Sequence, residues 1–278
     1  NKRSDGFHDI CTVFQTISLS DKITFTPADR ISLECSVKTI PTDERNLILR
    51  AASALKERFA IDKGAAIYLG KQIPSPGGLG GGSSNAAIAL LGLNRLWSIG
   101  AKIPELHELA ATLGSDVPFF LYGGTALGTG RGTEIEPLDN IELPTILVVT
   151  PKIKVSTAKA FGALGSRDLT PGDSERILLN CRFRAERGDF AGFDLDNDFE
   201  KTVFSDFPEI GDVKRTLLEL GAVSAAMSGS GASVFGIFDN TETRQTALKA
   251  LGDKPDWRSF AVAAISRSEY CEALKQVF

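Results

Sequence analysis

Glycine residues crowd one short stretch of the chain. Between Gly77 and Gly82 five of six residues are glycine, and Ser83, Ser84 and Asn85 follow directly. Such a segment is costly to order unless its backbone must adopt positive φ angles or approach another group closely. The stretch opens a predicted helix, whose N-terminus presents unpaired N–H groups and a partial positive charge. The pattern therefore predicts a phosphate-binding site, with Ser83 or Ser84 able to reach a Mg²⁺ ion that bridges phosphates.

This loop does not match the common phosphate-binding fingerprints. No lysine follows the glycines as in GxxxxGK[ST], and GxGxxG occurs nowhere in the chain. The alternative interpretation is a mobile linker with Ser84 or Asn85 as the N-cap of the helix. A linker does not usually run straight into a helix as apolar as AAIALLGLN, because burial of that helix fixes one end of the loop. Anion binding is therefore the favoured interpretation.

The composition is that of an ordinary folded protein and excludes several classes of partner. The chain has 278 residues, of which 42% are hydrophobic and 24% charged, enough for one large domain or two smaller ones. Its formal net charge of −4 provides no basic surface, so nucleic acid is not an expected partner. The longest apolar stretch, residues 86–93, is far shorter than the roughly 20 residues that span a bilayer. We expect a cytoplasmic protein without a membrane partner.

Potential metal ligands and disulfide partners are scattered. The four cysteines form no CxxC pair, and the only histidines are His8 and His107, so the sequence predicts no structural zinc site. A chain with this much core does not need disulfides, and reduced thiols in a reducing compartment are expected. The expected partner is a small-molecule substrate, and the expected state is a monomer or a weak homodimer.

Hydrophobic periodicity predicts the elements around the glycine loop. The first forty residues alternate as two or three antiparallel strands do, and apolar residues from Leu47 to Phe59 recur with a helical period after Asn46. The segment AAIYLGKQI is predicted to be a strand, so the loop joins a strand to the buried helix AAIALLGLNRLW. A further helix is predicted over 104–113, with Gly114 as its stop.

The second half of the chain predicts an α+β unit. The runs TALGTGRGTEIEPL and PTILVVTPK are typical of strands, whereas VSTAKAFGAL and DSERILLNCRF have helical spacing. The last third alternates helix, strand, strand, helix and strand, which is the order of a split βαβ arrangement. Pro151 is the predicted hinge, so the expected units are residues 1–150 and 151–278.

The glycine-rich stretch PSPGGLGGGSSNAA resembles the phosphate-binding motif of the GHMP kinase superfamily, which includes galactokinase, homoserine kinase and mevalonate kinase. Six more segments resemble blocks of that family in the family's order: RSDGFH, NLILRAA, LGSDVPFFLYGG, VSTAKAF, NDFE and SGSGASVFG. Ordered blocks from the first residues to about residue 240 are much more specific than one glycine run. The resemblance implies a two-domain α+β fold, with an N-terminal nucleotide-binding domain and a C-terminal ferredoxin-like (split βαβ) domain.

The resemblance also implies the ligands of the loop. It assigns ATP and Mg²⁺ to the protein, with a Mg²⁺ contact from Ser84. The residues that it places at ATP are Pro76, Gly77, Gly78, Leu79, Gly80, Gly81, Gly82, Ser83, Ser84 and Asn85.

The form G-L-G-G-G-S-S-N is similar to that of family members that phosphorylate a cytidine diphosphate-linked sugar alcohol, at its 2-hydroxyl, in the synthesis of isoprenoid precursors. The alternatives are a kinase for another small alcohol, such as homoserine or a mevalonate derivative, and a nucleotide-binding member without catalysis. Family members normally begin with a strand of the form S-x-A-K-x-N-L, whose lysine lies beside the catalytic aspartate. The chain starts at Asn1 without that strand, and we expect it to be a shortened form.

Asp116, in LGSDVPFF, has two possible roles. From the residues alone, an N-cap before Val117 and Pro118 is favoured, because Asp is common there. The resemblance instead places Asp116 at the family's catalytic aspartate, the base that takes the proton from the acceptor hydroxyl. Both roles are compatible with one side chain.

The base of a cytidine substrate requires a binding site of its own. The resemblance implies that Phe7 stacks on the cytosine, that His8 binds its polar edge, and that Phe183 closes the other face. An ordinary loop histidine and a core phenylalanine are the alternatives. The resemblance also implies that Gly229, Ser230 and Gly231 contact a phosphate through their backbone amides, whereas a plain tight turn explains them equally from sequence.

Overall fold

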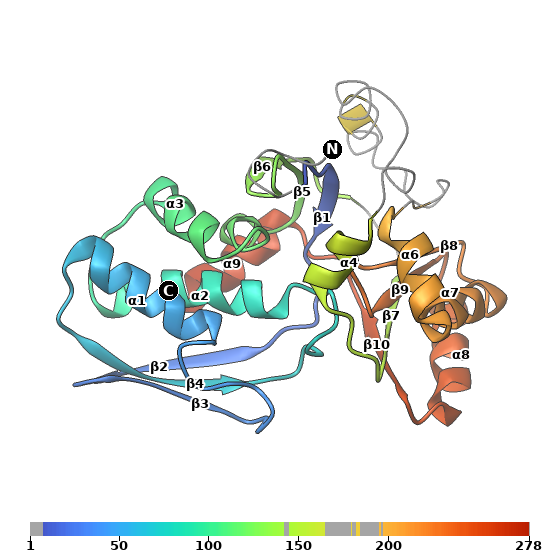
Figure 1. Cartoon of the computed structure of the whole chain (residues 1–278), viewed down its shortest axis with the longest axis horizontal. Coiled ribbons are helices and arrows are strands. Elements are labelled where there is room, and N and C mark those ends of the chain that lie inside the picture. Colours follow the sequence, from blue (N-terminus) through green and yellow to red (C-terminus); the bar gives the residue numbers. More distant parts are fainter. Residues whose placement is uncertain are drawn as a thin grey trace.

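The computed structural model describes residues 8–141, 145–164, 179, 182–183, 195 and 197–277. Among them, strands and helices alternate along the chain, as Figure 1 shows. The strands are β1 (Thr12–Gln15), β2 (Lys22–Ala28), β3 (Ile31–Cys35), β4 (Gly64–Gly70), β5 (Thr125–Thr129), β6 (Glu134–Pro137), β7 (Thr145–Pro151), β8 (Ser224–Met227), β9 (Val234–Phe238) and β10 (Trp257–Val262).

The helices are of α and 3₁₀ type. The α-helices are α1 (Leu47–Phe59), α2 (Gly81–Leu96), α3 (Ile103–Leu113), α4 (Thr157–Ala163), α6 (Phe199–Asp206), α7 (Pro208–Glu219), α8 (Thr241–Ala250) and α9 (Arg267–Val277). The 3₁₀ segments are η1 (Pro118–Leu121) and η2 (Leu251–Asp253). Within the described ranges, no helix is both long enough and apolar enough to cross a membrane.

The first half of the chain packs helices on a sheet of order β2-β4-β3. Strand β4 lies between the other two, antiparallel to β2 and parallel to β3. The expectation that the first strands pair with one another is therefore wrong, since β4 separates β2 from β3 and β1 joins a second sheet of order β1-β5-β6. Sequence alternation shows which face of a strand is buried but not which strand lies beside it.

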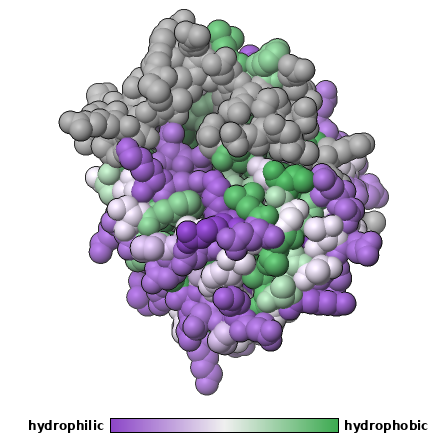
Figure 2. Space-filling model, turned by 90° about the vertical axis from the view of Figure 1, so that its right-hand side faces the viewer, coloured by the Kyte–Doolittle hydropathy of each residue, from purple (hydrophilic) through white to green (hydrophobic). Residues whose placement is uncertain are grey.

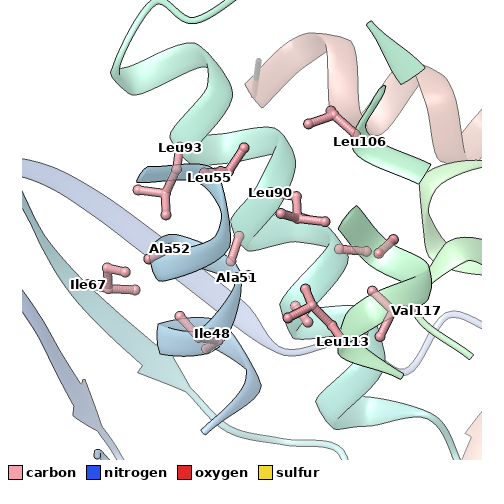
Figure 3. Packing of buried hydrophobic residues seen from close by; sticks show 14 of the residues in the cluster. Ile48, Ala51, Ala52, Leu55, Ile67, Leu90, Leu93, Leu106, Leu113 and Val117 are labelled. Atoms are coloured by element: carbon pink, nitrogen blue, oxygen red, sulfur yellow. The ribbon is translucent and has the colours of Figure 1, made fainter. Parts of the chain in front are cut away.

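A single apolar core holds α1, α2 and α3 on the β4 sheet (Figure 3). Helix α1 starts after Asn46, whose side chain accepts a hydrogen bond from the Ile48 amide, as is typical of an N-cap. Figure 3 shows its buried face against α2 and α3, and Val117 at the edge of the same cluster. This core fixes both the helix that follows the glycine loop and the segment that follows Asp116.

The second half forms a sheet of order β10-β7-β9-β8, covered by α6, α7 and α8 (Figure 1). The order α7, β8, β9, α8 and β10 confirms the predicted alternation of the last third. Strand β7, however, pairs with β9 and β10, although it lies almost wholly on the N-terminal side of the boundary predicted at 150/151. The chain therefore passes from the β1-β5-β6 sheet to the C-terminal sheet between β6 and β7. Pro151, the predicted hinge, is the last residue of β7.

Helix α9, which the sequence analysis did not predict, returns to the first half of the molecule. The Tyr270 hydroxyl donates a hydrogen bond to the Phe120 carbonyl at 2.6 Å, and Arg267 Nη2 donates to the Leu138 carbonyl at 3.0 Å. Burial raises the pKa of Tyr270, so its hydroxyl keeps the proton that it donates. The end of the chain thus stabilises η1.

The face formed by the second half, seen head-on in Figure 2, is largely hydrophilic, with a band of hydrophobic residues across its middle. Among the described residues, large hydrophobic side chains exposed in this half of the chain are Leu179, Phe183, Leu218 and Val223.

Candidate active site

The glycine loop leads from the segment after β4 into α2. Helix α2 begins at Gly81, with Gly80 as its N-cap at a φ of 64°. Its first hydrogen bond runs from the Ser84 amide to the Gly80 carbonyl at 2.8 Å. The amides of Gly81, Gly82 and Ser83 come before this bond and have no acceptor within the helix. The interpretation of Ser84 or Asn85 as an N-cap is therefore wrong, since both lie inside the helix.

Packing within the protein explains some of the glycines but not all of them. A Cβ on Gly80 would lie 2.8 Å from the Phe120 ring, and one on Gly78 would lie 2.3 Å from the Ser228 carbonyl oxygen. Gly82 is different, because it is exposed and a Cβ there would meet only Leu47, at an ordinary 3.8 Å. The fold thus leaves room for a side chain beside the free amides of α2, which is consistent with a ligand that approaches the backbone.

A second glycine-rich loop, residues 228–231, lies directly on the first. The Ser228 hydroxyl donates to the Gly78 carbonyl at 2.8 Å, and the Ser233 amide donates to the Gly77 carbonyl at 3.0 Å. The fold therefore places the two predicted phosphate-binding loops side by side, although about 150 residues separate them.

Two side chains of the NDFE segment hold the 228–231 loop. Asn197 Nδ2 donates to the carbonyls of Met227 at 2.7 Å and Gly229 at 2.8 Å. The Glu200 carboxylate accepts from the Met227 amide at 2.8 Å and pairs with Lys214 at 2.6 Å. The NDFE segment resembles a block of the family in sequence, and these hydrogen bonds give it a structural role.

The other residues predicted to contact ATP lie in different surroundings. Leu79 packs against the cluster of Ile146, Val148 and Val262 in the C-terminal sheet, so it joins the loop to that sheet. Asn85 is buried and donates its amide to Asp21 at 2.8 Å. The ligand contacts predicted for the set, which includes the exposed Pro76, stay predictions.

Asp116 lies between α3 and η1 with a partly buried side chain. The N-cap of η1 is Val117, and no side chain caps that segment, so the capping role is not found. Burial raises the pKa of the Asp116 carboxyl above its usual range, and no cation or hydrogen-bond donor among the described residues offsets this. A carboxylate with a raised pKa is suited to take up a proton near neutral pH.

Residues on either side of Asp116 contact the glycine loop and the segment that follows His8. Phe120, four residues after Asp116, packs on Gly80 of the loop. On the other side, Gly132 has Ile10 and Ser115 as neighbours, at 2.9 and 3.7 Å from the position of a Cβ.

His8 belongs to a row of aromatic rings. It stacks on Phe161 of α4, with ring centroids 5.5 Å apart and an angle of 29° between the planes. Phe161 in turn meets the ring of Phe199 edge to face at 4.8 Å. Phe161 was not predicted as a site residue, and its position in VSTAKAF, with the helical spacing of an ordinary amphipathic segment, gave no signal. Phe7 lies outside the described residues, so its stacking role stays a prediction.

Phe183 is 58% exposed. Its neighbour Arg182 is paired with Glu136 of β6, which ties this stretch to the β1-β5-β6 sheet. Most of the surrounding residues, including most of the predicted helix DSERILLNCRF, lie outside the described ranges. The predicted clamp of Phe7, His8 and Phe183 therefore remains untested.

Ser230 connects the 228–231 loop to α4. Its hydroxyl lies 3.0 Å from that of Thr157, in the first turn of α4, the helix that carries Phe161. The candidate site residues are thus linked in a circuit of direct contacts and short chain segments. In order, these contacts are Gly78 to Ser228, Ser230 to Thr157, Phe161 to His8, Ile10 to Gly132, Gly132 to Ser115, and Phe120 to Gly80.

No group of three or more His, Cys, Asp or Glu side chains in the described part of the chain is placed to hold a metal ion.

Comparison with known protein families agrees with this geometry. The family model for the GHMP kinases N terminal domain matches residues 46–124, which include the glycine loop and Asp116. The model for the GHMP kinases C terminal domain matches residues 183–256, which include the 228–231 loop. The chain belongs to the GHMP kinase family. It is an enzyme that transfers a phosphoryl group.

Curated relatives in the GHMP kinase family are similar over most of their length. The "4-diphosphocytidyl-2-C-methyl-D-erythritol kinase" of Thermodesulfovibrio yellowstonii is 40% identical over 251 residues, covering 89% of this chain and 87% of that protein. The protein of the same name from Syntrophotalea carbinolica is 37% identical and covers 95% of this chain and 93% of its own.

Solved structures show the same GHMP kinase fold. A crystal structure of 4-(cytidine 5'-diphospho)-2C-methyl-D-erythritol kinase matches with a TM-score of 0.74 and 32% identity, covering 94% of this chain and 93% of the other. The homoserine kinase from Cytophaga hutchinsonii matches with a TM-score of 0.70 but 21% identity, over 92% and 89% of the two chains, which shows the fold alone.

Proposed function

We propose that this GHMP kinase uses ATP and Mg²⁺ to phosphorylate the 2-hydroxyl of 4-diphosphocytidyl-2-C-methyl-D-erythritol. The names of its relatives at 37–40% identity support the substrate. The structural observation that carries the nucleotide part is the N-terminus of α2, where three amides lack helical acceptors and the exposed Gly82 has room for a side chain. We place the ATP phosphates there.

Different residues of this chain would bind the phosphates, bind Mg²⁺ and accept the proton. The amides of Gly81, Gly82 and Ser83 would bind phosphate oxygens, and the Ser84 hydroxyl would offer Mg²⁺ one hard oxygen ligand. When bound, Mg²⁺ neutralises charge on the phosphates. The Asp116 carboxylate accepts the proton of the substrate hydroxyl, whose oxygen forms a new bond to the γ-phosphorus while the bond to the β-phosphate oxygen breaks.

The acceptor would lie on the other part of the circuit. His8, with Phe7 and Phe183, would bind the cytosine, and the amides of Gly229, Ser230 and Gly231 would contact a phosphate of the substrate. We place Phe161 beneath His8 as the ring that holds the imidazole in position, because the two rings stack at 5.5 Å.

The direct test is an ADP-release assay with three acceptors: the cytidine diphosphate-linked methylerythritol, homoserine and mevalonate. We expect ATP-dependent turnover with the first and none above background with the others. Turnover with homoserine or mevalonate alone would support the alternative of a GHMP kinase for another small alcohol. The assay is run on this chain and on a form that carries the family's S-x-A-K-x-N-L strand before Asn1, since inactivity of both would support a nucleotide-binding role without catalysis.

Replacement of Phe183 by alanine tests the base-binding part of the proposal. Stacking on a base is worth about 1–3 kcal/mol, so we expect Phe183→Ala to raise the KM for the cytidine substrate by roughly tenfold. The KM for ATP should stay near that of the wild type. Leu179→Ala is the matched control, because Leu179 is a neighbouring hydrophobic side chain that is 66% exposed. An unchanged substrate KM in Phe183→Ala would remove this ring from the site.

A further inference from the structure

Asp21, just before β2, is a buried carboxylate that four groups contact. Oδ1 accepts hydrogen bonds from the amides of Gln72 at 2.7 Å and Ile73 at 2.8 Å. Oδ2 lies 2.8 Å from both Lys71 Nζ and Asn85 Nδ2. The side chain of Asp21 is 1% exposed and that of Lys71 is 6% exposed. This is an ion pair almost completely removed from water.

Stability alone is a poor reason to keep such a pair. Removing two charges from water costs several kcal/mol, and apolar residues of similar volume often replace a buried ion pair without loss of stability. What a fully hydrogen-bonded buried pair does supply is a fixed geometry, since few other arrangements satisfy every donor. The segments that Asp21 holds in place therefore indicate the role of the ion pair.

The groups around Asp21 lie on both sides of the glycine loop. Gln72 and Ile73 belong to the segment that enters the loop, and Asn85 lies in α2, which leaves it. Lys71 Nζ also donates to the Ile73 carbonyl. One carboxylate thus holds the chain before and after the loop, residues 76–82.

The same network reaches the first residue of α2. A Cβ on Gly81 would lie 2.9 Å from Ile73 Cγ2 and 3.3 Å from Lys71 Nζ, so both groups pack directly against this glycine. Gly81 is buried and carries the first of the three amides without a helical acceptor. The ion pair is therefore in contact with the backbone that we assign to the ATP phosphates.

We propose that Asp21 and Lys71 are positioning residues that hold the glycine loop in its phosphate-binding conformation. This inference rests on the proposed binding of ATP at the N-terminus of α2. The pair lies behind the loop and contacts it from the protein side, so it acts through the amides and not on the nucleotide. Loss of the pair would let the two ends of the loop move relative to each other, and amides that are no longer pre-organised bind phosphate less well.

The test variant is Asp21→Asn/Lys71→Met, because removal of one partner alone would leave a buried charge unpaired. We expect the double variant to fold, with the KM for ATP raised by at least about tenfold and the KM for the alcohol acceptor changed less than twofold. The ATP-induced rise in melting temperature should shrink in parallel. A merely structural pair would not separate the two KM values.

Lys63→Met is the matched control at the opposite end of the same helix. Lys63 Nζ donates to the carbonyl of Trp97, the C-cap of α2, at 2.9 Å. This variant also removes a lysine that fixes one end of α2, but it should leave the KM for ATP unchanged.

The outcomes separate this inference from the proposed function. If the wild-type protein neither binds nor uses ATP, the proposed function fails. If the wild type uses ATP and the folded double variant keeps the wild-type KM for ATP, the positioning role is overturned while the proposed function stands. Should the double variant not fold, Lys71→Gln takes its place, since its amide can still donate to Asp21 Oδ2 and Asp21 retains its other three hydrogen bonds, and a wild-type KM for ATP in that variant overturns the proposal equally.

Discussion

Asp116→Asn is expected to lower kcat by a factor of about 10²–10⁴, with little change in the KM for ATP. The amide has nearly the same shape as the carboxylate but cannot take the proton of the acceptor hydroxyl. The affected step is proton transfer, not nucleotide binding, so the two constants should separate in steady-state kinetics. Wild-type turnover in this variant would show that Asp116 is not the base.

The pH dependence of stability supplies an independent control for the same variant. Burial raises the pKa of the Asp116 carboxyl above its unfolded value, so between these two pKa values the folded protein holds the proton more tightly than the unfolded chain. Stability therefore falls as the pH rises through this window and stays lower above it. The variant has no such charge, so we expect it to melt at a higher temperature than the wild type at pH 7. The difference should shrink as the pH falls through the unfolded pKa of about 3.9 and disappear below about pH 3, where the carboxyl is protonated in both states.

Gly78→Ala is expected to reduce kcat/KM for ATP by about 10²-fold. Gly78 has a φ of 70°, which is strained for alanine, and a Cβ there would lie 2.3 Å from the Ser228 carbonyl oxygen and 2.7 Å from that of Gly231. Both atoms are backbone and cannot rotate away. The methyl group must therefore separate the two glycine-rich loops, which steady-state kinetics with ATP as the varied substrate would detect.

Gly252→Ala is the control for this effect. Gly252 has no heavy atom within 4 Å of a Cβ and no positive φ, so the same chemical change should leave kcat/KM for ATP unaltered. If Gly78→Ala also kept wild-type kinetics, the contact between the loops would have no part in ATP binding.

The sequence predicted local elements better than it predicted their neighbours. The period of α1 is a property of a few consecutive residues, and the helix that it predicted was confirmed. The position of β4 between β2 and β3, and that of β7 in the C-terminal sheet, depend on contacts between distant segments. Helix α9 was not predicted, although Tyr270, Ala273, Leu274 and Val277 in its sequence, RSEYCEALKQV, have helical spacing, so a local signal for it was present.

The same distinction holds for the candidate site. The glycine loop could be predicted because five glycines in six residues are unusual in any sequence, and the loop does lead into α2 as predicted. The contact of Ser228 with Gly78, the stacking of Phe161 on His8 and the pairing of Asp21 with Lys71 join residues that are 150, 153 and 50 positions apart. No periodicity or local motif encodes such pairs, and only the folded chain shows them.

The hydrogen bond from Tyr270 to the Phe120 carbonyl has a consequence for how the enzyme is made. The ribosome synthesises a protein from its N-terminus, so both glycine-rich loops and Asp116 emerge before Tyr270 does. The segment η1, which follows Asp116 and contains Phe120, is complete in sequence long before its partner in α9 is made. During synthesis, the turn that carries Asp116 therefore gains this hydrogen bond only after residue 270 has emerged, later than every strand in the described part of the chain.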